Sequence, residues 1–155
     1  MNELMRGKRG LIMGLANDKS LAWGIARRLG EAGAEMAFSY QGEALEKRVR
    51  PLAASVGSNF CFDCDVSDMA ALDRAFDTVG ERWDGLDFVV HAIGFSDKNE
   101  LRGGYVDTSL DNFLMTMNIS VYSFCAVAQR ARRMMKPGGS MLTLSYYGAE
   151  KVIPH

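Results

Sequence analysis

The sequence predicts a doubly wound α/β domain on a parallel sheet, and three features carry that prediction. Short apolar runs alternate with longer helical patterns along the chain. The runs are nearly continuous rather than alternating, as in strands covered on both faces. Strands and helices follow one another in strict turn, the order of a parallel sheet with right-handed crossovers. A length of 155 residues indicates a single domain over residues 1–155.

Five apolar runs are predicted to form the strands. The first ends at Gly14, where the chain turns polar, and each run has the length of a strand rather than of a helix. The runs cover residues 10–14, 35–40, 59–65, 86–92 and 140–145.

The segments between the strands are predicted to be four helices. The first covers residues 20–32 and is followed by Gly33, a residue type that commonly ends helices. The second covers residues 43–56, and Ser67 or Asp68 is the expected N-cap of the third.

The fourth helix is predicted to be the longest, over residues 110–135. The Pro137-Gly138-Gly139 segment is expected to end it. Before it, residues 94–104 form a polar loop on the carboxyl side of the sheet, where α/β proteins hold their ligands.

The bulk composition excludes several classes of protein. A net charge of −1 gives no reason to expect a nucleic-acid partner. The longest apolar run, residues 86–93, is far shorter than a membrane span. The basic residues before a short apolar run faintly resemble a signal peptide, but the run breaks at Gly14 and continues into a polar loop. We therefore interpret the run as a buried strand and expect a cytoplasmic protein.

Two of the three cysteines, Cys61 and Cys64, have the CxxC spacing of redox and zinc sites. They fall in a predicted strand, where residues three apart point to opposite faces. No second pair completes a zinc site. We therefore predict reduced cysteines of the core and no metal.

The loop from Gly14 to Ser20 joins the first strand to the first helix, where a Rossmann-type fold binds pyrophosphate. Gly14 permits a tight turn close to the phosphates, and Ser20 either caps the helix or donates its hydroxyl to a phosphate oxygen. The loop lacks the G-x-G-x-x-G spacing. Gly24 is expected to pack the helix closely on the sheet.

The ends of the second and third strands are predicted to meet the adenosine. Gln41 stands where many dinucleotide folds have an acidic residue, and no arginine is near to hold a 2′-phosphate, which favours NADH over NADPH. Asp65 and Val66 suit an adenine amino group and ring. The alternatives are a solvated turn for Gln41 and a helix cap for Asp65.

The end of the fourth strand, His91-Ala92-Ile93-Gly94, is predicted to lie along the nicotinamide ribose through the backbone of Ile93 and Gly94. His91 is interpreted as a structural histidine.

A set of motifs in this order resembles the bacterial NADH-dependent enoyl-acyl-carrier-protein reductases, a divergent branch of the short-chain dehydrogenase/reductases. The resemblance covers the whole chain. The motifs are Gly14-(x5)-Ser20-Leu21-Ala22-Trp23-Gly24-Ile25-Ala26, Tyr40-Gln41, Cys64-Asp65-Val66, His91-Ala92-Ile93-Gly94-Phe95, Ser145-Tyr146-Tyr147-Gly148-Ala149-Glu150 and Ile153-Pro154.

The resemblance implies a homotetramer that reduces the double bond of a trans-2-enoyl thioester on acyl carrier protein. It places Ser96 near the acyl substrate and makes Tyr146 an active-site tyrosine, while Tyr147 is interpreted as a packing aromatic. It implies contacts with NADH for Gly14, Ser20, Leu21, Gln41, Asp65, Val66 and Ile93.

The same resemblance puts the family's catalytic tyrosine directly after His155, with a lysine further on. The sheet and the catalytic set are thus expected to be incomplete at the C-terminal end, and the 155-residue chain to have little activity. The alternatives are a non-catalytic dinucleotide-binding module and another short-chain reductase that acts on a carbonyl.

Overall fold

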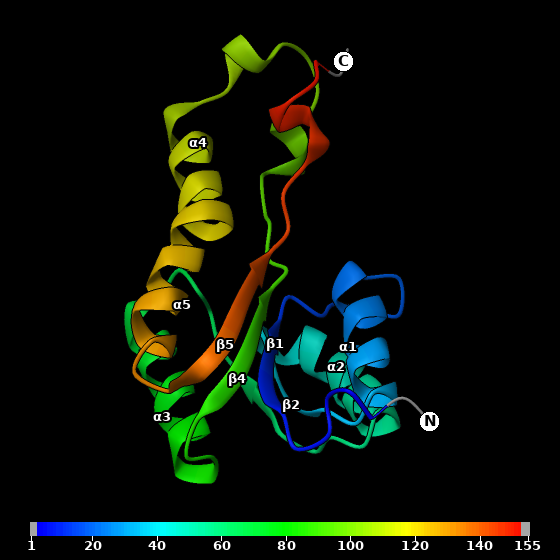
Figure 1. The fold of residues 1–155 in the computed structure, drawn as a ribbon. Coiled ribbons are helices and arrows are strands. Elements are labelled where there is room, and N and C mark those ends of the chain that lie inside the picture. The colour runs from blue at the N-terminus through cyan, green and yellow to red at the C-terminus, as the bar shows by residue number, and fades with distance from the viewer. Residues whose placement is uncertain (1–2, 153–155) are drawn as a thin grey trace.

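The computed structural model describes residues 3–152, and its sheet confirms the predicted fold class. Five strands, all paired in parallel, lie in the order β3-β2-β1-β4-β5 (Figure 1). Ile153 and Pro154, the last motif of the resemblance, lie outside the described residues. The strands are β1 (Arg9–Met13), β2 (Glu35–Tyr40), β3 (Cys61–Asp63), β4 (Leu86–His91) and β5 (Met135–Thr143).

Helices cover both faces of this sheet (Figure 1). Successive strand residues point to opposite faces, so Leu11 belongs to one core cluster and Ile12 to the other. The cluster of Ile12 includes α1 (Leu21–Glu31) and α2 (Gly42–Ser55), and that of Leu11 includes α3 (Met69–Arg82) and α5 (Ser123–Ala131).

The prediction of one helix over residues 110–135 was wrong. The segment is α4 (Leu110–Met117), a π-helical turn η3 (Asn118–Tyr122) and then α5, which ends at Ala131. The carbonyl of Met134 accepts a hydrogen bond from the amide of Leu86 at 2.8 Å, so sheet pairing takes over where the helix was expected to continue.

The Pro137-Gly138-Gly139 segment was also misassigned, because it lies within β5. Leu86 pairs with Met135 and Phe88 with Ser140, so the register shifts across this segment. Proline lacks an amide donor and Gly138 has φ of +81°, which together suit a bulge in an edge strand.

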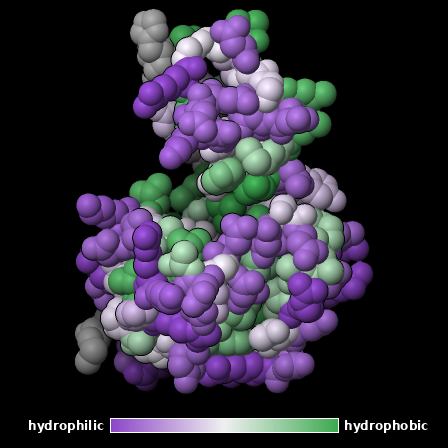
Figure 2. Space-filling view, turned by 180° about the vertical axis from the view of Figure 1, so that it is seen from behind, coloured by the Kyte–Doolittle hydropathy of each residue, from purple (hydrophilic) through white to green (hydrophobic). Residues whose placement is uncertain are grey.

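Three short 3₁₀ helices complete the fold, namely η1 (Lys98–Glu100), η2 (Tyr105–Asp107) and η4 (Tyr147–Ala149). With α4 they form a narrower upper part of the molecule (Figure 1). From behind, apolar side chains gather in a hollow between this part and the broad lower body (Figure 2). Within residues 3–152, the structure has no helix long and apolar enough to cross a membrane.

Of three predictions about single residues in or beside the helices, two were confirmed. Asp68 caps α3, since its carboxylate accepts a hydrogen bond from the amide of Ala70 at 2.8 Å. Gly33 has φ of +93°, as a glycine after a helix often does. Gly24, however, is exposed, and a Cβ atom there would meet nothing within 4 Å. It does not pack α1 on the sheet.

We expect a polypeptide of residues 1–155 to self-associate. β5 is an edge strand of the described sheet, and Leu142 within it and Leu144 just after it are half-exposed. Such an edge is a template for pairing with another chain. Size-exclusion chromatography with light scattering should show a mass that rises with concentration. L142K should reduce this rise, whereas a monomer at every concentration would contradict the expectation.

Candidate functional site

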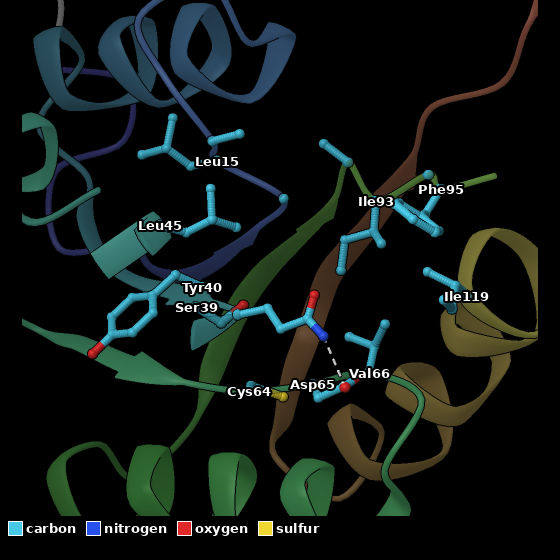
Figure 3. Close-up of a pocket in the computed structure, with 15 residues that line it drawn as sticks. Leu15, Ser39, Tyr40, Leu45, Cys64, Asp65, Val66, Ile93, Phe95 and Ile119 are labelled. Atoms are coloured by element: carbon cyan, nitrogen blue, oxygen red, sulfur yellow. Dashed lines mark hydrogen bonds between the residues drawn. The ribbon is translucent and has the colours of Figure 1, made fainter. Parts of the chain in front are cut away.

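A pocket of about 370 Å³ lies at the carboxyl ends of the central strands (Figure 3). Each of β1 to β4 contributes the residues just after its end, and α2 and η3 close the sides. Of the residues predicted to contact the cofactor, Gly14, Gln41, Asp65, Val66 and Ile93 line this pocket. The full lining is Gly14, Leu15, Ala16, Ser39, Tyr40, Gln41, Leu45, Cys64, Asp65, Val66, Ala92, Ile93, Gly94, Phe95 and Ile119.

Gly14 is required by the close approach of β1 and β4. Its φ is +95°, and a Cβ atom would lie 2.1 Å from the carbonyl oxygen of Ala92. The amide of Ala92 donates to the carbonyl of Met13 at 2.9 Å and fixes this approach. The chain can therefore turn here and leave an open cradle for a ligand only if residue 14 has no side chain.

Ser20 closes the loop that follows Gly14. Its Oγ accepts hydrogen bonds from the amides of Ala16 and Asn17 at 3.1 and 3.0 Å, and it makes no capping bond to α1. Because the oxygen acts as acceptor in both bonds, the hydroxyl proton is left to donate. Ser20 and the exposed Leu21 stand at the start of α1, outside the lining of the pocket.

Asp65 is held at the pocket by three hydrogen bonds. Its Oδ1 accepts from the amide and the hydroxyl of Ser67 at 2.8 and 2.7 Å, and its Oδ2 accepts from Nε2 of Gln41 at 2.8 Å. The Ser67 hydroxyl foremost keeps the pKa of Asp65 below its ordinary value. Since Asp68 caps α3, the capping alternative for Asp65 is wrong.

The segment after β4 is clamped by the π-helical turn η3. Oγ of Ser120 accepts from the amide of Phe95 at 2.9 Å and donates to its carbonyl at 3.1 Å. Ile119 from the same turn lines the pocket. Neither residue was singled out from the sequence, because a π turn within a helix leaves no distinct signal in the apolar periodicity.

His91 is structural, as predicted. It is fully buried, with Nε2 at 2.7 Å from Oγ of Ser123 and Nδ1 at 3.1 Å from Oγ1 of Thr143. Oγ of Ser123 donates to the carbonyl of Ile119 at 2.6 Å, so we assign the imidazole proton to Nε2. Burial lowers the pKa of His91 below its ordinary value.

The residues expected near the substrate lie outside this pocket. Ser96 lines a second cavity of about 360 Å³, where its Oγ accepts from Oγ1 of Thr116 at 3.0 Å. Tyr146 follows β5 and is 73% exposed. The described part of the chain thus brings together five of the seven residues predicted to contact the cofactor, and leaves Ser96 and Tyr146 apart from them.

Cys61 and Cys64 are reduced and belong to the cores, as predicted, whereas Cys125 is exposed. No group of His, Cys, Asp or Glu within residues 3–152 is arranged to hold a metal ion. Burial first, and then the charge of Asp63, raises the pKa of Cys64 to about 12.

We expect Cys64 to resist alkylation at neutral pH, although it lines the pocket. A pKa near 12 leaves it about a thousandth of the thiolate of an ordinary thiol. Iodoacetamide followed by peptide mass spectrometry should modify Cys125 first and Cys64 only on unfolding. Modification of Cys64 at the rate of Cys125 in the folded chain would contradict this.

The parallel sheet, the glycine turn after β1 and the polar residues at the carboxyl ends of β2 and β3 define a Rossmann-like α/β protein. The chain belongs to the family described as enoyl-(acyl carrier protein) reductase, whose sequence pattern matches residues 14–155.

Several relatives agree with this assignment. The chain is 62% identical over 152 residues to enoyl-[acyl-carrier-protein] reductase [NADH] 1 of Rhizobium meliloti (strain 1021), covering 98% of this chain and 56% of the relative. The crystal structure of FabI from Candidatus Liberibacter asiaticus superposes with a TM-score of 0.97 at 55% identity, over 99% of this chain and 60% of that one.

A reductase from Anaplasma phagocytophilum, solved in complex with NAD, gives a TM-score of 0.95 at 58% identity, over 99% of this chain and 59% of that one. The chain therefore spans about three fifths of the length of the relatives it matches.

Proposed function

We propose that the chain is the cofactor-binding domain of an NADH-dependent enoyl-acyl-carrier-protein reductase. Such an enzyme reduces the carbon–carbon double bond of a trans-2-enoyl thioester on acyl carrier protein. The observation that carries this proposal is the pocket at the strand ends, in a chain 62% identical to a reductase named for NADH.

The residues of the pocket fit a dinucleotide. Gly14 leaves an open cradle where a Cβ atom would clash with Ala92, and the start of α1 with the Ser20 hydroxyl offers donors to phosphate oxygens. Leu21 begins the same helix. Ile93 presents its backbone to the nicotinamide ribose, and Val66 its side chain to the adenine ring.

The preference for NADH over NADPH is supported by the charges of the pocket. Among residues 3–152, no side chain that lines the pocket is cationic, and Gln41 and Asp65 are a neutral amide and an anion. A 2′-phosphate would gain no cationic partner at Gln41 and would face the carboxylate of Asp65.

NADH, when bound, supplies a hydride to the β-carbon of the thioester, and negative charge develops on the thioester oxygen. A hydroxyl that donates to this oxygen contributes about 100- to 1,000-fold in rate. In the family this donor is the catalytic tyrosine. Among the described residues we assign an active-site position to Tyr146, the family's upstream tyrosine, and place Ser96 beside the acyl chain. The family's spacing places its catalytic tyrosine and lysine after residue 155, so we expect residues 1–155 alone to turn over little substrate.

We further propose that the full-length protein is a homotetramer in the cytoplasm. The apolar side chains that α4 exposes support the tetramer, because such a face is commonly buried between subunits. Its exposed side chains include Leu110, Phe113, Leu114 and Met117.

The reaction is tested with the full-length protein. Steady-state assays with NADH should show higher kcat/KM for crotonyl thioester than for a β-ketoacyl thioester. A preference for the ketone would overturn the proposal in favour of another short-chain reductase, and saturable NADH binding without turnover of either would favour a non-catalytic module.

A further inference from the structure

Two side chains from different elements meet across the floor of the pocket. Gln41 lies between β2 and α2, whereas Asp65 follows β3. Nε2 of Gln41 donates to Oδ2 of Asp65 at 2.8 Å, the bond drawn as a dashed line to Asp65 in Figure 3. A neutral amide therefore touches Asp65, the one carboxylate among the residues of 3–152 that line the pocket.

The backbone conformation at Gln41 and Gly42 sets the direction in which the Gln41 side chain points, toward Asp65. Gln41 is extended, with φ of −112° and ψ of 112°, and its side chain does not cap α2. The next residue, Gly42, has φ of +73°, and its amide donates to Oδ1 of Asp63 at 2.6 Å. The strand end and this turn therefore set the direction of the amide.

The hydrogen bonds of Asp65 leave one acceptor position for a ligand. Two donors from Ser67 occupy Oδ1, and Gln41 occupies one side of Oδ2. A carboxylate oxygen accepts about two hydrogen bonds. The remaining position on Oδ2 lies within a pocket that also presents Val66 to a flat ring.

We propose that Gln41 is a positioning residue that orients the Asp65 carboxylate to read the exocyclic amino group of the adenine base. This inference rests on the proposed binding of NADH. The amino group of adenine can donate to the free position of Oδ2. In hypoxanthine a carbonyl oxygen replaces this amino group, so two hydrogen-bond acceptors would face each other. The pair thus selects an adenine dinucleotide by its base.

The test compares the affinities of the chain for NADH and for reduced nicotinamide hypoxanthine dinucleotide, by calorimetric titration. The wild type should bind NADH about 10-fold or more tightly, as a hydrogen bond to a charged group implies. In Gln41→Leu this ratio should fall about 3-fold or more, because Kd for NADH rises while Kd for the hypoxanthine analogue does not.

Two further variants separate positioning from direct contact. Gln41→Asn keeps the amide but is one methylene too short, and should behave as Gln41→Leu does. Asp65→Asn should lose the discrimination, and adding Gln41→Leu to it should change the ratio no further. Because Gln41 is exposed, thermal melts of its variants should match that of the wild type.

Several results would overturn the inference while leaving the proposed function intact. These are equal affinity of the wild type for both dinucleotides, a Gln41→Leu variant that weakens both equally, and a Gln41→Asn variant with full discrimination. If the wild type shows no saturable binding of NADH, the proposed function fails and the inference fails with it.

Discussion

Gly14→Ala is expected to weaken NADH binding at least 100-fold and to lower the free energy of unfolding by about 2–4 kcal/mol. The new Cβ atom would lie 2.1 Å from the Ala92 carbonyl oxygen, on a backbone with φ of +95°. Since the backbone fixes the position of Cβ and the contact partner is a backbone carbonyl, no side-chain rotation relieves the clash. The loop that follows β1 must therefore move, which changes the space that it leaves for the cofactor. Titration with NADH and urea unfolding measure the two effects.

Gly24→Ala is the matched control for this substitution. Gly24 lies in α1 with open space around its Cβ position, so the same change should stabilise the chain by about 0.5–1 kcal/mol. NADH affinity should stay within about 2-fold, because the added methyl group contacts nothing. Equal effects of the two substitutions would contradict the role given to Gly14.

His91→Ala is expected to lower the free energy of unfolding at pH 7.5 by about 2–5 kcal/mol. The change empties a fully buried site and removes the ring partner of Thr143 and Ser123. Thermal or urea unfolding monitored by circular dichroism gives the difference from the wild type.

The effect of His91 should also depend on pH. Burial lowers its pKa in the folded chain, whereas the unfolded chain keeps a value of about 6.5. The unfolded state therefore binds more protons below this pH, and the contribution of neutral His91, fully present above it, is lost as pH falls through the folded pKa.

The difference between wild type and His91→Ala should accordingly shrink from pH 7.5 to pH 5. The carboxylates of Asp65, Asp84 and Asp87 have lowered pKa values and do not titrate in this window. A difference that is constant from pH 7.5 to pH 5 would contradict the assignment of a buried, neutral imidazole.

The strand pattern was sufficient to predict the sheet and much of the pocket. Apolar runs on both faces specify parallel strands, and such strands bring Gly14, Gln41, Asp65 and Ile93 to one edge although they are far apart in sequence. These residues could be found from the sequence because each ends or directly follows a predicted strand.

What could not be predicted depends on tertiary contacts. The contact of the π turn with the segment after β4 depends on the bonds between Ser120 and Phe95. Residues 132–135 lie outside the helix, and the amide of Leu86 bonds to the carbonyl of Met134 there. The Gln41–Asp65 bond depends on the length and direction of two side chains across the pocket. No periodicity in the sequence encodes such contacts.

The central claim, that NADH binds at the carboxyl ends of the strands, is tested most directly by hydrogen–deuterium exchange with and without NADH. We expect protection of residues 14–20, 41–45, 64–67 and 92–95, which line or border the pocket. Exchange that NADH leaves unchanged in these segments, or protection confined to the second cavity around Ser96, would contradict it.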